Sequence, residues 1–222
     1  MFEWKWDFTF EILPRMLVAA VNTLLAAGFG YAIALILGLA FALLQRTRYP
    51  IVTFVVRECV EFVRSTPLVL QIFFIFYVGP QFGLRLSPWA SGMIAIGLHY
   101  AAYLSEVYRA GLDSVPKGQW EACTALNLSP QRTYFKIIIP QAIPLTIPGF
   151  GNYLVGIFKD TPMLSVIGVA ELMHAATAVG SETYRYLEPY TLVGVIFLII
   201  SLPAAWLIRR FELWVRKSLG ML

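Results

Sequence analysis

Long apolar runs separated by short polar segments dominate the chain, and their lengths suit a lipid bilayer. A hydrocarbon core about 30 Å thick needs roughly 20 apolar residues per helix. The runs predict five transmembrane helices, at 18–44, 51–79, 88–108, 137–158 and 190–208. The expected fold class is therefore an all-α integral membrane protein, with residues 1–222 forming a single transmembrane domain and no room for a second, soluble catalytic domain.

Two of these runs contain residues that disturb helices. In the second run, charged residues stand at helical i,i+3 and i,i+4 spacing, so we expect one continuous helix with a polar cytoplasmic end, kinked at Pro67. The fourth run carries Pro140, Pro144 and Pro148, which predict a broken or kinked helix. Broken helices in membranes are tolerated where they face protein or a water-filled path.

The lysines and arginines between the runs predict the orientation, because basic loops stay on the cytoplasmic side. Five of them fall in the segments 1–15, 78–88 and 159–189. Twelve fall in the alternate segments, 45–64, 107–136 and 209–222. The N-terminus is thus expected outside and the C-terminus inside.

Composition supports the membrane assignment and excludes other classes. The chain is 59% hydrophobic and 14% charged, and its net charge of +4 comes from short segments between apolar runs, with no basic patch for nucleic acid. Its two cysteines and two histidines are isolated, so the sequence predicts neither a disulfide framework nor a metal site.

The polar segment 109–136, between the third and fourth runs, is the expected coupling loop on the cytoplasmic side. Residues 116–118 predict a turn, and residues 119–128 a short helix ended by Asn127, a residue type that tolerates the left-handed cap conformation. Small side chains allow another surface to approach closely, and Glu121 offers a carboxylate near the helix start. These features predict a docking site for a cytoplasmic partner.

This loop resembles the motif of permease subunits of ATP-binding-cassette (ABC) importers, which reads Glu-Ala-Ala, three residues, Gly, nine residues, then Ile-x-Leu-Pro. The matching residues here are Glu121, Ala122, Cys123, Asn127 at the glycine position, and Ile137-Ile138-Ile139-Pro140. Further segments resemble the polar amino acid branch of those permeases: 64–71, 102–106, 109–111, 118–122, 159–161 and 165–168. Pro162 departs from that branch, which usually has serine there.

The resemblance implies a bacterial inner-membrane, multi-pass permease that lies in the lipid bilayer. Two permease subunits, identical or homologous, would form the path, cytoplasmic ABC ATPase subunits would hold ATP and Mg, and an extracytoplasmic binding protein would deliver the solute. This chain has no Gly-x-x-x-x-Gly-Lys-Ser/Thr loop, so we expect it to bind no cofactor and to be no enzyme. Its ATPase-coupling residues would be Glu121, Ala122, Cys123, Asn127 and Pro140.

Ionisable groups within or beside a span are costly and usually face a cavity or a partner. That reasoning predicts a substrate path for a zwitterion, with charged and neutral polar side chains along it. The candidate path residues are Gln71, Tyr103, Glu106, Lys159, Asp160 and Thr161. The alternative interpretation is that Lys159 pairs with Asp160 or Glu106 for structural reasons alone.

Two other functions fit an apolar chain. A self-sufficient secondary transporter or channel would use the same charged residues as coupling groups, but the chain has no internal repeat and carries the docking-loop motif. A membrane-embedded enzyme would need a nucleophile with its base or a metal-ligand set, and no such spacing is present. Polar amino acids and cyclic zwitterionic compatible solutes would both suit the predicted path.

Overall fold

A computed structural model of the chain describes residues 3–218, and every regular element in that range is helical. Four long helices form the body: α1 (Trp6–Leu44), α4 (Pro88–Asp113), α7 (Ile139–Asp160) and α9 (Leu187–Ser218). The shorter helices are α2 (Pro50–Ser65), α3 (Leu68–Phe73), α5 (Lys117–Ala125), α6 (Pro130–Arg132) and α8 (Leu172–Thr183). Single π-helical or 3-10 turns cover Phe74–Val78, Gly79–Phe82, Thr133–Ile138 and Thr161–Ile167.

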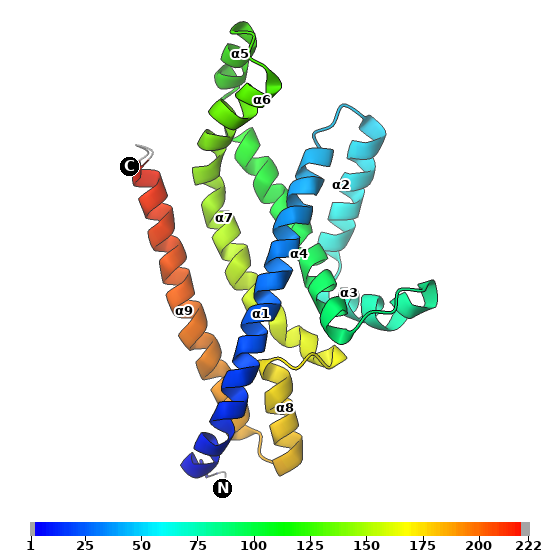
Figure 1. Ribbon diagram of the computed structural model, residues 1–222, viewed down its shortest axis with the longest axis vertical. Helices are drawn as coiled ribbons and strands as arrows, with labels where there is room; N and C mark the ends of the chain where they lie inside the picture. The colour runs from blue at the N-terminus through cyan, green and yellow to red at the C-terminus, as the bar shows by residue number, and fades with distance from the viewer. Residues whose placement is uncertain (1–2, 219–222) are drawn as a thin grey trace.

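The arrangement separates two ends of the molecule (Figure 1). The helices α5 and α6 project at one end, where the turn between α1 and α2 and the C-terminal part of α9 also lie. The start of α1, the helix α8 and the start of α9 gather at the opposite end. The segments predicted to be cytoplasmic therefore share one end of the fold.

Close contact between α1 and α4 forms the centre of the core. Small residues make it possible: a Cβ added at Gly97 would lie 2.4 Å from Cγ2 of Ile33, and one added at Gly38 would lie 3.0 Å from the carbonyl oxygen of Ala101. Interfaces between membrane helices favour such small residues because they let backbones approach. The outer faces of α1 and α9 stay apolar and exposed, as lipid contact requires.

The expected continuous helix over 51–79 is wrong. The chain breaks between Ser65 and Leu68, and the two parts meet at 107°. Thr66, which precedes Pro67, has extended backbone angles (φ −107°, ψ 140°). A residue before proline is forced away from the helical region, and the proline itself has no N–H to continue the helix, so the break follows from this dipeptide.

Of the two expected outcomes for the fourth run, a broken or a kinked helix, the break is absent. The helix α7 continues through Pro144 and Pro148. Pro140 directly follows the π-helical segment Thr133–Ile138, so the helical hydrogen-bond pattern changes where the proline lacks its N–H. The three prolines are spaced by four, so the lost hydrogen bonds lie on one side of the helix and the other side holds it together. A bend of 45° follows later, between Ile167 and Leu172.

Several helices are longer than the sequence predicts. α1 begins at Trp6 instead of residue 18, α4 continues to Asp113, and α9 reaches Ser218. By length and apolar composition alone, α1 and α9 can cross a membrane within the described residues, and up to four spans result if each of two bent helix pairs counts as one. The helix α4 is long enough to span a membrane, but its polar and aromatic residues make it less apolar than α1 and α9.

Candidate solute path and docking loop

A hollow of about 590 Å³ opens between α4 and α7, and we call it the tyrosine hollow. Residues one helical turn apart line it on the α4 side, so a single face of that helix forms the wall. The α7 side contributes a carboxylate, an amide and two glycines. The complete lining is His99, Tyr100, Tyr103, Val107, Gly149, Asn152, Tyr153, Gly156 and Asp160.

Aromatic rings and one carboxylate define its chemistry. The Tyr153 ring centroid lies 6.0 Å from that of Tyr100 and 5.6 Å from that of Tyr103, so three tyrosines meet across the two helices. Tyr100 donates a hydrogen bond of 2.7 Å from its hydroxyl to Oδ2 of Asp160. Tyrosine faces and a carboxylate together attract a cationic group.

Lys159 and Asp160 face different spaces although they are neighbours in sequence. Successive residues on a helix point about 100° apart. Lys159 lines a second hollow of about 470 Å³ between α7 and α9, together with Arg209 and Glu212. Among the ion pairs of residues 3–218, none joins Lys159 to Asp160 or Glu106. The structure therefore does not contain the purely structural pairing considered above.

Two other predicted path residues are engaged in local structure. Gln71 donates from Nε2 to the carbonyl oxygen of Val63 at 2.8 Å and to Oγ1 of Thr66 at 2.7 Å, which caps the broken end of α2. Its Oε1 lies 3.2 Å from Nδ1 of His99, a residue of the tyrosine hollow. Thr161 is buried and donates to the carbonyl oxygen of Phe158. Neither Gln71 nor Thr161 lines the tyrosine hollow.

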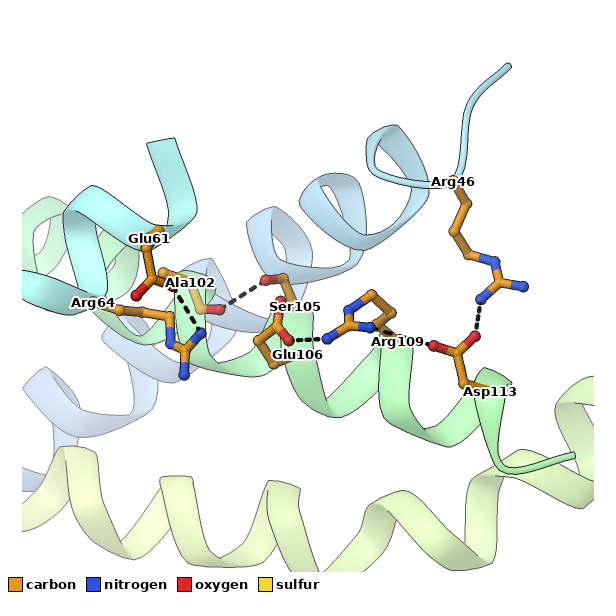
Figure 2. Close-up of polar contacts among 8 residues, drawn as sticks. All are labelled: Arg46, Glu61, Arg64, Ala102, Ser105, Glu106, Arg109 and Asp113. Atoms are coloured by element: carbon orange, nitrogen blue, oxygen red, sulfur yellow. Dashed lines mark hydrogen bonds and ion pairs between the residues drawn. The ribbon is translucent and has the colours of Figure 1, made fainter. Parts of the chain in front are cut away.

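Glu106 does not line the tyrosine hollow but begins a ladder of ion pairs along α4 (Figure 2). It pairs with Arg109, whose Nη1 lies 3.4 Å from Oδ2 of Asp113. Arg46, at the end of α1, reaches Oδ1 of Asp113 at 2.5 Å. The Arg46 guanidinium also lies 5.8 Å from the ring of Trp120 in α5. We call Glu106, Arg109, Asp113 and Arg46 the charged ladder.

The docking loop has the predicted cap but other bounds. Its helix, α5, begins at Lys117 and ends at Ala125, so residues 117 and 118 lie in the helix and not in a turn. Asn127 takes the left-handed conformation (φ 49°), and its N–H bonds to the carbonyl oxygen of Thr124. The N–H of Leu128 bonds to the carbonyl oxygen of Cys123, which completes a Schellman cap. The position that holds glycine in the resembled motif therefore needs φ above zero, and asparagine supplies it.

One side of the docking loop is buried against the rest of the protein, and the other side is exposed. Cys123 is buried, and Trp120 packs with Val115, Ile138 and Ala142 at the start of α7. Glu121 and Ala122 are exposed on α5, at the projecting end of the fold, and Pro140 is exposed on α7. The carboxylate is thus presented on a rigid support.

The sequence matches, over residues 30–217, the family described as binding-protein-dependent transport system inner membrane component. The chain belongs to this family. A probable amino-acid ABC transporter permease protein, y4tG of Sinorhizobium fredii, is 42% identical over 94% of each chain. The glutamine transport system permease protein GlnP of Escherichia coli is 32% identical over 95% of this chain and 97% of that protein.

Solved structures agree with the family. The crystal structure of an amino acid ABC transporter with histidines matches with a TM-score of 0.89 and 30% identity, over 95% of this chain and 99% of that one. The protein is therefore a permease subunit of an ABC importer, a membrane protein that works with ATPase partners. Its relatives are transport permeases of ABC importers, not enzymes, and this family assignment sets the self-sufficient transporter aside.

Sequence reasoning about this permease found some of the tyrosine hollow and missed the rest. Tyr103 and Asp160 were predicted path residues and both line it. Tyr100, Asn152 and Tyr153 were missed, and His99 was assigned no role. The signal available was the spacing of His99 and Tyr103, four residues apart on one face of an apolar helix. Tyr153 gave no such signal, because only the contact between α4 and α7 brings it to that face.

Proposed function

We propose that this permease passes polar amino acids or similar zwitterions through the tyrosine hollow. The observation that carries the proposal is the Asp160 carboxylate, held by Tyr100 at 2.7 Å inside a hollow walled by three tyrosines. An α-ammonium group can pair with that carboxylate and lie against the tyrosine faces. Two relatives, a probable amino-acid ABC transporter permease and a glutamine transport permease, support this solute class.

The proposed assembly contains two permease subunits, identical or homologous, in the bacterial plasma membrane. An extracytoplasmic binding protein delivers the solute, and cytoplasmic ATPase subunits hold ATP and Mg, while this chain holds no cofactor. The exposed Glu121 on α5 is the proposed contact with the ATPase. Its position at the projecting end of the fold supports that role.

The proposed topology has five spans, with the N-terminus outside and the C-terminus inside. The split of basic residues supports it, five against twelve on alternate segments. In a variant without native cysteines, a thiol reagent that does not cross membranes should label Ser181→Cys from outside and miss Ser129→Cys. The reverse labelling would overturn the orientation and the docking proposal with it.

Substitution of Asp160 tests the solute site. Loss of a hydrogen-bonded charge costs about 1.5 to 3 kcal/mol, so Asp160→Asn should reduce solute uptake by roughly 10- to 100-fold in reconstituted vesicles. Lys159→Gln is the matched control, because it removes the neighbouring charge that faces the other hollow. Binding of the ATPase should be unchanged in both variants.

Comparison with Lys159→Gln also shows which results would contradict the proposed solute site. Equal uptake defects in Asp160→Asn and Lys159→Gln would indicate a general charge effect and contradict a site in the tyrosine hollow. Normal uptake in Asp160→Asn would remove the carboxylate from the path. Tyr100→Phe keeps the charge and removes only the hydrogen bond, so its defect should be smaller than that of Asp160→Asn.

A further inference from the structure

The turn between α1 and α2 contains a hollow that neither the solute path nor the docking loop uses. It has a volume of about 360 Å³, and we call it the turn hollow. Two arginines, two threonines, a proline and an aromatic residue surround it: Thr47, Arg48, Pro50, Thr53, Phe54 and Arg57.

The turn hollow has an excess of positive charge. Within residues 3–218, Arg48 makes no ion pair, and its guanidinium lies 5.5 Å from the Tyr49 ring. Arg57, whose guanidinium lies 5.9 Å from the Phe54 ring, forms its one ion pair within the same residues with Glu58, at 3.3 Å. Both side chains of that pair are more than half exposed, so it is weak. The first turn of α2 has no acidic residue, and its free N–H groups add positive potential.

Exposed apolar side chains stand directly beside this charge. Ile51 is 77% exposed, and Tyr49 and Phe54 are each 58% exposed. The apolar run of α1 ends at Leu44, only a few residues before the turn hollow, so the hollow lies at the level where hydrocarbon meets water. A free inorganic anion would need the arginines but not the apolar rim.

From this combination we infer that the turn hollow binds the phosphate headgroup of an anionic phospholipid. Arg48 and Arg57 hold the phosphate oxygens, and the acyl chains run along Ile51 and Phe54. The hydroxyls of Thr47 and Thr53 already donate to the carbonyl oxygens of Leu44 and Thr47, so the arginines make the contact with the headgroup. Basic pockets at the cytoplasmic end of membrane helices recognise anionic headgroups in this way. Bound lipid would fix the start of α2, which buries only Val60 within the described protein.

Lipid binding to the purified full-length permease in neutral detergent tests the inference. Native mass spectrometry should show retention of phosphatidylglycerol over phosphatidylcholine. The double variant Arg48→Gln with Arg57→Gln should weaken phosphatidylglycerol binding by about 30-fold, from roughly fivefold per charge. The matched control, Arg132→Gln with Lys136→Gln, removes two exposed charges from the docking loop and should change the affinity less than about threefold.

Several outcomes would overturn the inference. Equal retention of the two lipids, or full phosphatidylglycerol binding by the double variant, would remove the headgroup site. Displacement of the lipid by millimolar inorganic phosphate alone would assign the arginines to a free anion. Efficient crosslinking of Thr53→Cys to a second permease subunit would assign the turn to the subunit interface. Unchanged thermal unfolding of the double variant in neutral detergent confirms that it folds, and Arg48→Gln alone is the fallback variant.

Discussion

The docking loop and the tyrosine hollow are both polar islands in an apolar chain, but they are built in different ways. The docking helix and its cap lie within 117–128, and Trp120 anchors them on Val115, Ile138 and Ala142, which are all close in sequence. The tyrosine hollow needs Tyr100 on α4 and Asp160 on α7, sixty residues apart. A local site can change without disturbing a distant one, and we therefore expect the two functions to be separable.

Reversal of charge at Glu121 should give the largest effect on the docking side. Breaking a desolvated charge pair commonly costs about 2 to 5 kcal/mol, so Glu121→Lys should weaken ATPase binding by at least about 30-fold and abolish uptake. Co-purification with the ATPase and uptake in vesicles measure both. Radioligand binding to the tyrosine hollow should stay normal, and a matching loss there would contradict the separation of the two sites.

Filling the tyrosine hollow should produce the opposite pattern. A Cβ at Gly156 would lie 3.1 Å from the Tyr100 hydroxyl oxygen, so Gly156→Leu should occupy the space and reduce uptake about tenfold or more. ATPase co-purification should remain normal. Gly194→Leu on α9 is the control, because nothing lies within 4 Å of a Cβ there. If both leucine variants fail equally, added bulk in the membrane is the cause.

The cap at Asn127 tests how far the docking loop depends on local backbone. Asn127→Gly should preserve the loop, because glycine takes the left-handed conformation freely. Asn127→Ala should destabilise it locally by about 1 kcal/mol. Faster amide exchange in α5, with a modest loss of ATPase affinity, is the expected result. Equal exchange in the two variants would mean that packing of Trp120, not the cap, holds the helix.

These two sites also mark what the sequence could predict. The cap, the docking helix and the long apolar helices follow from local patterns, and the structure has them. At Pro67 the local pattern predicts only a kink, whereas the chain breaks. Gln71, from beyond the proline, donates to the carbonyl oxygens of Val63 and Thr66 that the break leaves free, and this contact is not contained in the proline signal. Lys159 and Asp160 line separate hollows because α9 packs on one side of α7 and α4 on the other. A local sequence pattern does not contain this packing.

The charged ladder is a candidate link between α4 and the docking helix, and its substitution should give the smallest effect of these variants. Arg109 is its central member and is 44% exposed, so each of its pairs is worth about 1 kcal/mol or less. Arg109→Gln should therefore leave solute binding and ATPase binding nearly normal. It should instead lower the number of solutes moved per ATP by about twofold to fivefold. The reason is that Arg109 holds Asp113, which in turn holds Arg46 against the ring of Trp120.

A double-mutant cycle with Asp113→Asn tests whether the ladder acts as a unit. Contacting groups in one network couple, so the combined variant should be no worse than Arg109→Gln alone. Arg15→Gln, which breaks an exposed pair with Glu182 at the other end of the molecule, is the matched control and should leave the ratio unchanged. Additive losses from Arg109→Gln and Asp113→Asn would show that the two residues act independently. In that case the ladder would not tie α4 to Trp120 of the docking helix as one unit, and the two sites would be fully separate.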